Sequence, residues 1–281
     1  MQVEIGIDQQ LATVYLDSYE SSCINLLDPT DLEFEYMQQM TAAIEAFMPG
    51  EELLALHLGG AACALPLAWH HLHRGSTQTV VELNGELATA MRELFSLPRA
   101  PHLKIRVGEA WEQLSAMRSE RFKVIVRDVF AGAQTPRPLR SLEFYRKAYD
   151  VLKPGGLLLV NIVHGKGDDA RADVAAALDA FEHVSVVSEG AILSGSRRGN
   201  VVIVAYKPES SGNDEVAKDN AEVAPATPAS VDVTGGEIDI SKHWKEFQRL
   251  IRRLAIPPRY LNRAEAARWA GTTRPILLEQ N

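Results

Sequence analysis

Residues 52–206 repeat one pattern, in which a short apolar run is followed by a turn and then by a segment of helical length. The runs are almost continuously apolar, without regular polar interruptions. Such runs are typical of strands buried on both faces, as in a parallel sheet with helices on either side. We therefore expect an α/β domain with a mostly parallel sheet. The predicted strands cover residues 53–58, 79–83, 103–107, 124–126, 157–162, 184–187 and 201–205.

The N-terminal residues 1–30 carry a different pattern. Apolar and polar side chains alternate over residues 12–16 and again over residues 23–26. Alternation with a period of two predicts half-buried strands. Asp17 and Ser18 lie between the two segments and favour a turn. We predict that this part of the chain forms a small antiparallel β-hairpin element.

The rest of the chain divides by composition. Residues 31–208 form the main domain, which begins with a helix because residues 31–47 carry one apolar helical stripe. Residues 209–239 contain eight acidic residues and one lysine, with few large apolar side chains. Such a segment buries too little apolar surface to offset the entropy lost on ordering, so it is predicted to be a flexible acidic linker. Residues 240–281 form a basic helical tail with nine Lys or Arg and three Asp or Glu.

The tail combines positive charge with an apolar face. A helix predicted over residues 242–254 places Trp244, Phe247 and Leu250 on one side, and a second short helix is predicted over residues 262–270. A basic tail could bind nucleic acid, but an apolar stripe needs an apolar partner. We expect the tail to pack against residues 1–206 or against a second copy of the chain, as in a homodimer.

Overall composition limits the classes of function. The net charge of −8 and the pI of about 5.5 argue against a general nucleic-acid binder. No segment predicts a leader peptide or the ~18 apolar residues of a membrane helix. Cys23 and Cys63 lack the spacing of a metal site and are expected to be reduced thiols. The expectation is a cytoplasmic protein with a small-molecule substrate, no metal, and neither a membrane nor nucleic acid as partner.

The first two predicted strands end in residues suited to a nucleotide. Ligands of open α/β sheets lie at the carboxyl ends of the strands. Gly59 and Gly60 follow the first strand, where they would allow the backbone to approach a ligand closely, although a plain tight turn explains them equally. Glu82 follows the second strand at about the spacing of a ribose-binding acid. An exposed carboxylate at a strand end is the alternative.

The next two strands also end in acidic residues. Gly108 and Glu109 follow the third strand, where a carboxylate could accept the amino group of an adenine and the glycine would let the base lie close. Asp128 follows the apolar fourth strand, an expensive place for an unpaired charge. It is either a functional residue or the partner of Arg127 or Arg137 in a salt bridge.

The sequence segments LHLGG, VVELN, VGEAWEQL, VIVRDVFAG and EFYRKAYDVLKPGGLLLVNI follow one another along the chain. In this order they resemble the spermidine synthase family over residues 11–206, and in particular its shorter synthase-like proteins of actinobacterial type. The resemblance implies a class I methyltransferase-type, Rossmann-like sheet preceded by a β-hairpin. It also implies an S-adenosyl nucleotide as co-substrate, either decarboxylated S-adenosylmethionine or S-adenosylmethionine.

The same resemblance implies roles for individual residues. Gly59 and Gly60 would lie at the sulfonium end of the nucleotide, Glu82 at the ribose and Glu109 near the adenine. Tyr36 and Asp128 would lie near the amine acceptor as catalytic residues. The implied nucleotide-binding residues are Gly59, Gly60, Glu82, Gly108, Glu109 and Asp128.

Two positions depart from the family pattern. Aminopropyltransferases carry a GGGDG-type loop, whereas this chain reads GGAAC and has Ala62 in place of the acid. They also carry a D-x-[ST]-D-P loop whose second Asp is the base, and here that position is Ala131. General-base catalysis by a positioned residue contributes about 10²–10⁴-fold, so the chain lacks groups that matter for the reaction.

Three functions remain. The first is an aminopropyltransferase of polyamine biosynthesis, which transfers the aminopropyl group of decarboxylated S-adenosylmethionine to putrescine or another amine. The second is methyl transfer from S-adenosylmethionine to an unknown small acceptor, where positioning of the nucleophile does most of the work. The third is a non-catalytic descendant that binds a nucleoside.

Overall fold

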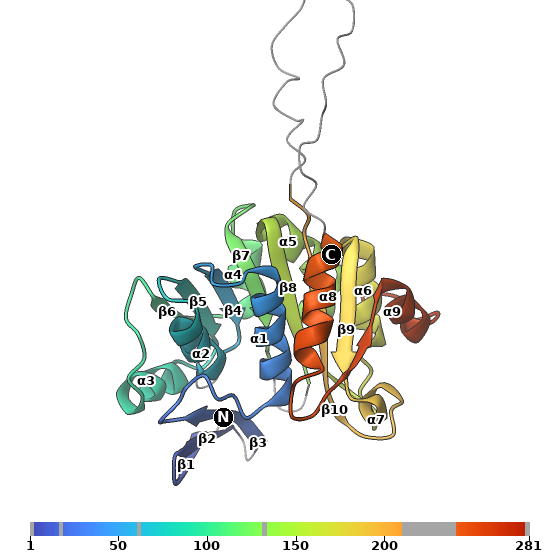
Figure 1. Cartoon of the computed structure of the whole chain (residues 1–281). Helices are drawn as coiled ribbons and strands as arrows, with labels where there is room; N and C mark the ends of the chain where they lie inside the picture. Colours follow the sequence, from blue (N-terminus) through green and yellow to red (C-terminus); the bar gives the residue numbers. More distant parts are fainter. Residues whose placement is uncertain (1–2, 17–18, 61–62, 131–133, 210–239, 279–281) are drawn as a thin grey trace, which may run out of the picture.

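The computed structural model describes residues 3–16, 19–60, 63–130, 134–209 and 240–278. They form a small three-stranded sheet and an eight-stranded sheet with helices on both faces (Figure 1). The strands of the large sheet lie in the order β11-β9-β10-β8-β7-β4-β5-β6. One face is covered by α1, α2, α3 and α8, and the other by α4, α5, α6, α7 and α9.

The small sheet is formed by the N-terminal residues. It contains β1 (Val3–Asp8), β2 (Leu11–Leu16) and β3 (Tyr19–Asn25), which pair antiparallel in this order. The alternation in the sequence predicted an antiparallel element with the two strands of a hairpin. The structure has a third strand, β1, which was not predicted. The predicted turn at Asp17 and Ser18 lies outside the described residues. In Figure 1 this sheet lies beside the end of the large sheet at which β9 ends.

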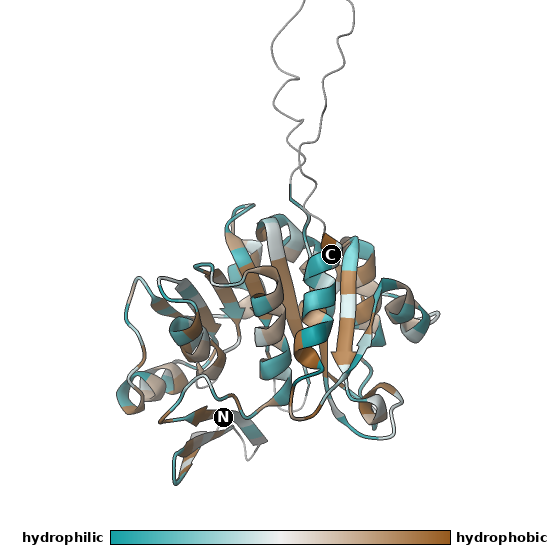
Figure 2. Ribbon diagram, in the orientation of Figure 1, coloured by the Kyte–Doolittle hydropathy of each residue, from teal (hydrophilic) through white to brown (hydrophobic). Residues whose placement is uncertain are grey.

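The core of the large sheet is parallel, as the apolar runs predicted. Strands β6, β5, β4, β7 and β8 pair parallel, and β10 then pairs antiparallel with both β8 and β9. Figure 2 shows apolar residues concentrated in these central strands. The bounds are β4 (Leu54–Leu58), β5 (Thr77–Glu82), β6 (Leu103–Val107), β7 (Phe122–Arg127), β8 (Leu152–His164), β9 (His183–Ser188) and β10 (Gly199–Tyr206).

Helices connect the strands. The chain runs outward from β4 through β5 to β6 and then returns to β7 on the other side of β4. This change of direction makes the carboxyl ends of β4 and β7 the switch point at which α/β folds bind ligands. The helix bounds are α1 (Glu35–Phe47), α2 (Ala64–Leu72), α3 (Gly85–Leu94), α4 (Ala110–Ser115), η1 (Arg137–Arg140), α5 (Leu142–Val151), α6 (Arg171–Ala180) and α7 (Gly190–Leu193).

The C-terminal residues pack onto the main domain. They form α8 (Ile240–Ile251), β11 (Arg259–Leu261) and α9 (Arg263–Ala270). Phe247 of α8 is fully buried, and Trp244 packs edge-on against Phe47 of α1 with ring centroids 4.8 Å apart. The apolar face that the sequence predicted therefore packs against α1, while the outer face of α8 is hydrophilic (Figure 2).

The tail also extends the large sheet, which the sequence did not predict. β11 pairs antiparallel with β9 as an edge strand. It is only three residues long and follows Pro257-Pro258, so its pattern indicated no more than the end of a helix. Beyond α9, the N–H of Leu142 donates to the carbonyl of Ile276 at 2.8 Å. Apart from Glu209, the predicted linker 209–239 lies outside the described residues.

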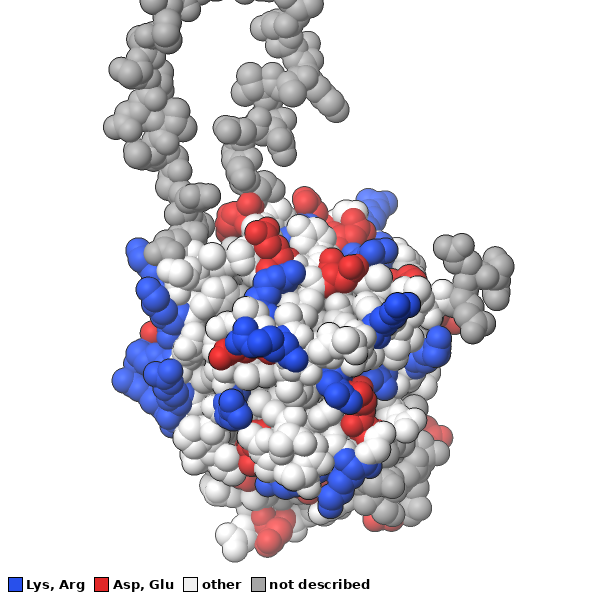
Figure 3. Space-filling view, turned by 90° about the vertical axis from the view of Figure 1, so that its right-hand side faces the viewer, with Lys and Arg blue, Asp and Glu red and all other residues white. Residues whose placement is uncertain are grey.

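The charges on one side of the molecule are mixed. Figure 3 shows Lys and Arg side chains on several parts of this surface, with Asp and Glu among them. Among the described residues, no helix is long and apolar enough to span a membrane.

Candidate functional site

Gly59 joins the two loops at the switch point. Its backbone has φ +77°, and a Cβ at this position would lie 2.2 Å from the carbonyl oxygen of Asp128. The N–H of Asp128 also donates to the carbonyl of Leu58 at 2.9 Å. Only glycine tolerates both this φ and this close approach. The loop after β4 therefore lies directly against the loop that begins at Asp128.

Gly60 brings the same loop against the next strand. A Cβ there would lie 2.3 Å from Cγ1 of Val80 in β5. Close packing of the chain thus explains both glycines, so the contact with a nucleotide remains a prediction. Ala61 and Ala62 lie outside the described residues. Burial raises the pKa of the Cys63 thiol to about 12, which keeps it protonated and a poor nucleophile.

Glu82 ends β5 at the same edge of the sheet. Its Oε1 accepts a hydrogen bond from the N–H of Asn84 at 3.0 Å, and Oε2 has no hydrogen-bond partner among the described residues. Asn84 in turn caps α3, since its Oδ1 accepts from the N–H groups of Glu86 and Leu87. The turn after β5 thus fixes the position of the carboxylate and leaves one oxygen available for a ligand.

Two apolar side chains beside Glu82 are strongly exposed. Leu83 is 69% exposed and Val107 is 60% exposed. Val107 pairs with Glu82 across the β5–β6 ladder. A shallow surface hollow is lined by Leu83, Asn84 and one side of α3 as far as Glu93. Apolar side chains next to a carboxylate suit a flat base attached to a sugar. Sequence reasoning missed both residues, although each follows or ends a strand at the predicted edge.

Glu109 has a local structural role. It is the N-cap of α4, and its Oε2 accepts a hydrogen bond from the N–H of Glu112 at 2.7 Å. Gly108 precedes it, and a Cβ there would lie 3.1 Å from Nε2 of Gln113. Capping accounts for an acid at this position without a ligand. A contact between Glu109 and an adenine therefore also stays a prediction.

Asp128 lies on the α1 side of the sheet and is held by two neutral donors. The hydroxyl of Tyr36 donates to Oδ2 at 2.8 Å, and Nδ2 of Asn161 donates to Oδ1 at 2.9 Å. Burial raises the pKa of the Asp128 carboxyl, while the hydrogen bonds from Asn161 and Tyr36 oppose that rise. Burial and the nearby carboxylate raise the pKa of Tyr36 well above 10. Tyr36 is therefore always protonated and can donate.

Asn161 lies near the carboxyl end of β8, and sequence reasoning missed it. The only signal was a polar residue inside the run 157–162, which was predicted as a buried strand. The structure thus brings together Tyr36 from α1, Asp128 from the end of β7 and Asn161 from β8. The second acid position of the family, Ala131, lies outside the described residues.

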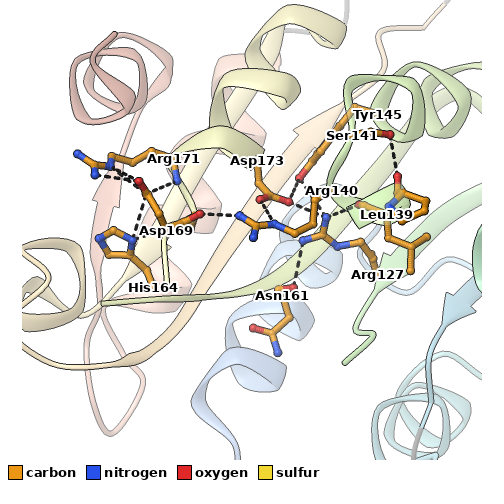
Figure 4. Close-up of polar contacts among 12 residues, drawn as sticks. Arg127, Leu139, Arg140, Ser141, Tyr145, Asn161, His164, Asp169, Arg171 and Asp173 are labelled. Carbon is orange, nitrogen blue, oxygen red and sulfur yellow. Dashed lines mark hydrogen bonds and ion pairs between the residues drawn. The ribbon is translucent and has the colours of Figure 1, made fainter. Parts of the chain in front are cut away.

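Asp128 does not form the salt bridge that the sequence left open. Successive strand residues point to opposite faces of a sheet, so Arg127 points away from Asp128. Its Nη1 donates to Asp173 Oδ1 at 2.8 Å and to the carbonyl of Leu139 at 2.6 Å. Nε of Arg140 donates to the other oxygen of Asp173 at 2.8 Å, which closes a buried ion cluster (Figure 4).

The second candidate partner, Arg137, donates to the carbonyl of Leu277. Asp128 is therefore a partly buried carboxylate without a direct ion pair among the described residues. Such a group is suited to receive a cation from outside the chain. Among the described residues, no group of three or more His, Cys, Asp or Glu side chains is placed to hold a metal ion.

Comparison with solved structures agrees with the resemblance. The chain is similar to a "probable spermidine synthase" from Corynebacterium glutamicum, with 28% identity, a TM-score of 0.80, and coverage of 99% of this chain and 94% of that one. It has the fold of the spermidine synthases. No protein-family model matches the chain, and no curated protein matches its sequence.

Two further structures share the spermidine synthase-like fold at lower similarity. One is a spermidine synthase in complex with the transition state analogue AdoDATO, with 16% identity, a TM-score of 0.53, and coverage of 87% of this chain and 84% of that chain. The other is human methyltransferase-like protein 13 in complex with SAH, with 15% identity, a TM-score of 0.55, and coverage of 79% of this chain and 94% of that chain.

Proposed function

We propose that this chain is an aminopropyltransferase of the spermidine synthase type. Its donor would be decarboxylated S-adenosylmethionine, and its acceptor putrescine or another small amine. The observation that carries the proposal is the partly buried Asp128 carboxylate, which has no ion pair among the described residues and is held by Tyr36 and Asn161 at the switch point of a spermidine synthase-like fold. A cationic acceptor would supply the missing counter-charge.

The neighbouring strand ends support binding of the nucleotide. The free oxygen of Glu82 is suited to accept hydrogen bonds from ribose hydroxyls. Leu83 and Val107 offer exposed apolar surface for the adenine. The sulfonium would then lie near the loop that begins at Gly59, which is in contact with Asp128. This arrangement would bring donor and acceptor together at the carboxyl ends of β4 and β7.

In the proposed reaction, the lone pair of the acceptor nitrogen attacks the aminopropyl carbon that is bonded to sulfur. A C–N bond forms as the C–S bond breaks, and methylthioadenosine leaves with the electron pair of the broken bond. The nitrogen becomes a substituted ammonium and then loses a proton to solvent. Asp128 holds a protonated nitrogen of the acceptor by its negative charge, while another nitrogen of the acceptor, present as free amine, attacks. Tyr36 fixes the orientation of the Asp128 carboxylate.

The replacement of two family acids by Ala62 and Ala131 has a kinetic consequence. Without a dedicated base, the attacking nitrogen must arrive as free amine, and alkylamines lose their proton near pH 10. The rate should therefore rise with pH across the neutral range. The absence of a positioned base costs about 10²–10⁴-fold in rate, so turnover should be slow.

The same replacements favour methyl transfer as a second candidate. A nucleophile that is reactive without deprotonation needs positioning more than a base, and the fold is shared with a methyltransferase-like protein. In that case intact S-adenosylmethionine would be the donor. Asp128 would then orient a polar or cationic acceptor.

One assay separates these functions. The purified chain is incubated with decarboxylated S-adenosylmethionine and with putrescine, cadaverine or spermidine, and methylthioadenosine is measured. Release that depends on the amine and is lost in Asp128→Asn would support the proposal. If the nucleotide binds but no amine causes release, the aminopropyltransferase proposal is wrong. Assays with intact S-adenosylmethionine then distinguish a methyltransferase from a non-catalytic nucleoside-binding protein.

A further inference from the structure

Asn161 places a primary amide inside an otherwise apolar part of β8. Its side chain is 1% exposed, and residues 157–160 before it are fully buried. In the β8–β10 ladder it lies opposite Val202. A buried amide is unfavourable unless its polar atoms are hydrogen-bonded. The amide should therefore be satisfied on both sides, by protein or by ligand.

Among the residues that the structure describes, only one side of this amide is satisfied. Nδ2 donates to Oδ1 of Asp128 at 2.9 Å. Oδ1 of Asn161 is buried and has no hydrogen-bond partner among the described residues. A carboxylate can only accept hydrogen bonds, so the amide must turn its NH₂ group toward Asp128. Its oxygen is thereby left as an unpaired acceptor, which native proteins rarely leave without a partner.

The corner formed by Asp128 and Asn161 has a definite chemical preference. Both residues contribute oxygens that can accept, and one of them carries a negative charge. A ligand that satisfies both must bring at least two N–H or O–H donors, and a positive charge is favoured. A primary ammonium has three donors and a positive charge, as the Lys side chain does. A hydroxyl group has a single donor and no charge.

We propose that Asn161 is a binding residue for a primary amine acceptor. Its amide oxygen accepts one N–H of the terminal nitrogen, while the Asp128 carboxylate accepts another. Asn161 thus has two tasks, because its NH₂ group orients the carboxylate and its oxygen contacts the ligand. This inference rests on the proposed aminopropyltransferase function and names the group that recognises its acceptor. The oxygen of Asn161 would thus be a hydrogen-bond acceptor for the amine in a site where Ala62 and Ala131 replace two acids of the family.

The test compares acceptor binding with nucleotide binding. Putrescine is titrated by calorimetry into wild type and Asn161→Leu, each saturated with methylthioadenosine, and the Michaelis constant for putrescine is measured in parallel. Loss of a hydrogen bond to a charged ligand predicts a dissociation constant about 10- to 100-fold higher. Affinity for methylthioadenosine should stay within about twofold, because the proposed nucleotide-binding residues follow β4, β5 and β6 rather than β8. Unchanged putrescine affinity in Asn161→Leu would overturn the inference while leaving the function intact.

A second variant covers the case in which Asn161→Leu fails to fold. Asn161→Asp has nearly the same shape and keeps an acceptor oxygen, but it loses the donor to Asp128 and places two carboxylates together. Like charges raise carboxyl pKa values. Putrescine binding should therefore persist at high pH. As pH is lowered, binding should be lost at a higher pH in Asn161→Asp than in wild type. This pH midpoint reports the pairing of the two carboxylates, whereas contact with the ligand is reported by the affinity at high pH. There the retained acceptor oxygen predicts an affinity closer to that of wild type than to that of Asn161→Leu, and a purely structural role for Asn161 predicts no such recovery. Loss of binding at every pH would also contradict the inference.

Wild type itself distinguishes this inference from the underlying function. If wild type binds methylthioadenosine but neither binds nor converts any amine, the proposed function fails and the inference fails with it. If wild type converts putrescine and the Asn161 variants bind putrescine as tightly as wild type does, the inference alone is wrong.

Discussion

Tyr36 on α1 donates its hydroxyl to Oδ2 of Asp128 over 2.8 Å, although the two residues are 92 positions apart in the chain. The pKa shifts of the pair indicate that Tyr36 is the hydrogen-bond donor and Asp128 the acceptor. Burial raises the pKa of Tyr36 well above 10, so it remains a donor. Burial also raises the pKa of Asp128 from 3.8, while the two hydrogen bonds oppose that change. The carboxylate is thus partly desolvated and oriented before any ligand binds.

Removal of the Tyr36 hydroxyl should move the pH dependence of acceptor binding. Tyr36→Phe deletes a hydrogen bond to the carboxylate, and such bonds contribute about 1.5–3 kcal/mol. The pKa of Asp128 should therefore rise further, because one of the hydrogen bonds that lowers it is lost. The charged form of Asp128 binds the cation. As pH is lowered, putrescine affinity should therefore be lost at a higher pH in Tyr36→Phe than in wild type. Calorimetry between pH 4 and pH 8 measures this midpoint, and a midpoint that coincides with wild type would disprove the link.

Asp128 should lower stability at neutral pH. Its folded-state pKa lies above the unfolded value, so ionisation opposes folding and the free energy of unfolding decreases as pH rises above 3.8. Asp128→Asn removes this ionisation. The variant should therefore melt at a higher temperature than wild type at pH 7, and the difference should shrink toward pH 4. Thermal unfolding at both pH values tests this, and a variant less stable than wild type at pH 7 would contradict it.

Glu82→Ala should weaken nucleotide binding. The variant loses a charge-assisted hydrogen bond to the ribose, about 1.5–3 kcal/mol, which corresponds to roughly 10- to 150-fold in the dissociation constant. Calorimetry with S-adenosylmethionine, its decarboxylated form and methylthioadenosine measures the effect. Glu182→Ala, which changes an exposed acid before β9, is the control and should bind normally. An affinity within twofold of wild type for Glu82→Ala would remove this residue from the site.

Phe247→Ala should show that the C-terminal helix stabilises the domain. The Phe247 side chain is fully buried, and truncation of a buried Phe costs about 3–5 kcal/mol. The melting temperature should fall by about 10 °C. Lys245→Ala on the exposed face of α8 should change it little. Equal melting temperatures for the two variants would indicate that α8 contributes no stability.

Asp173→Asn should be strongly destabilising. The carboxylate joins Arg127 and Arg140, and both Arg127 and Asp173 side chains are fully buried. Removing one partner of a buried pair leaves an uncompensated charge and costs about 3–5 kcal/mol. Asp179→Asn breaks the exposed pair with Arg146 and should cost less than about 1 kcal/mol. Chemical denaturation measures both, and similar losses would show that burial of the cluster is not what matters.

Hydrophobic pattern alone was enough to predict most of the fold. The apolar runs predicted β4 through β10 because a strand that is buried on both faces has few polar positions. The elements that were missed have weak local patterns. The alternation in β1 covers only six residues and includes Gly6, a residue depleted in strands, and β11 is three residues long. Both become strands because a neighbouring strand offers free hydrogen-bonding groups, which local sequence does not reveal.

The sequence by itself also determined which candidate residues share one edge of the sheet, because residues that follow parallel strands meet at their carboxyl ends. Gly59, Glu82 and Asp128 were found in this way. Only the tertiary structure decided which partners they have. Asn161 reaches Asp128 because both lie on the α1 face of adjacent strands, whereas Arg127 points to the opposite face and pairs with Asp173 from α6. Hydrogen-bond partners depend on face and register between distant segments, and those are set by packing of the whole domain.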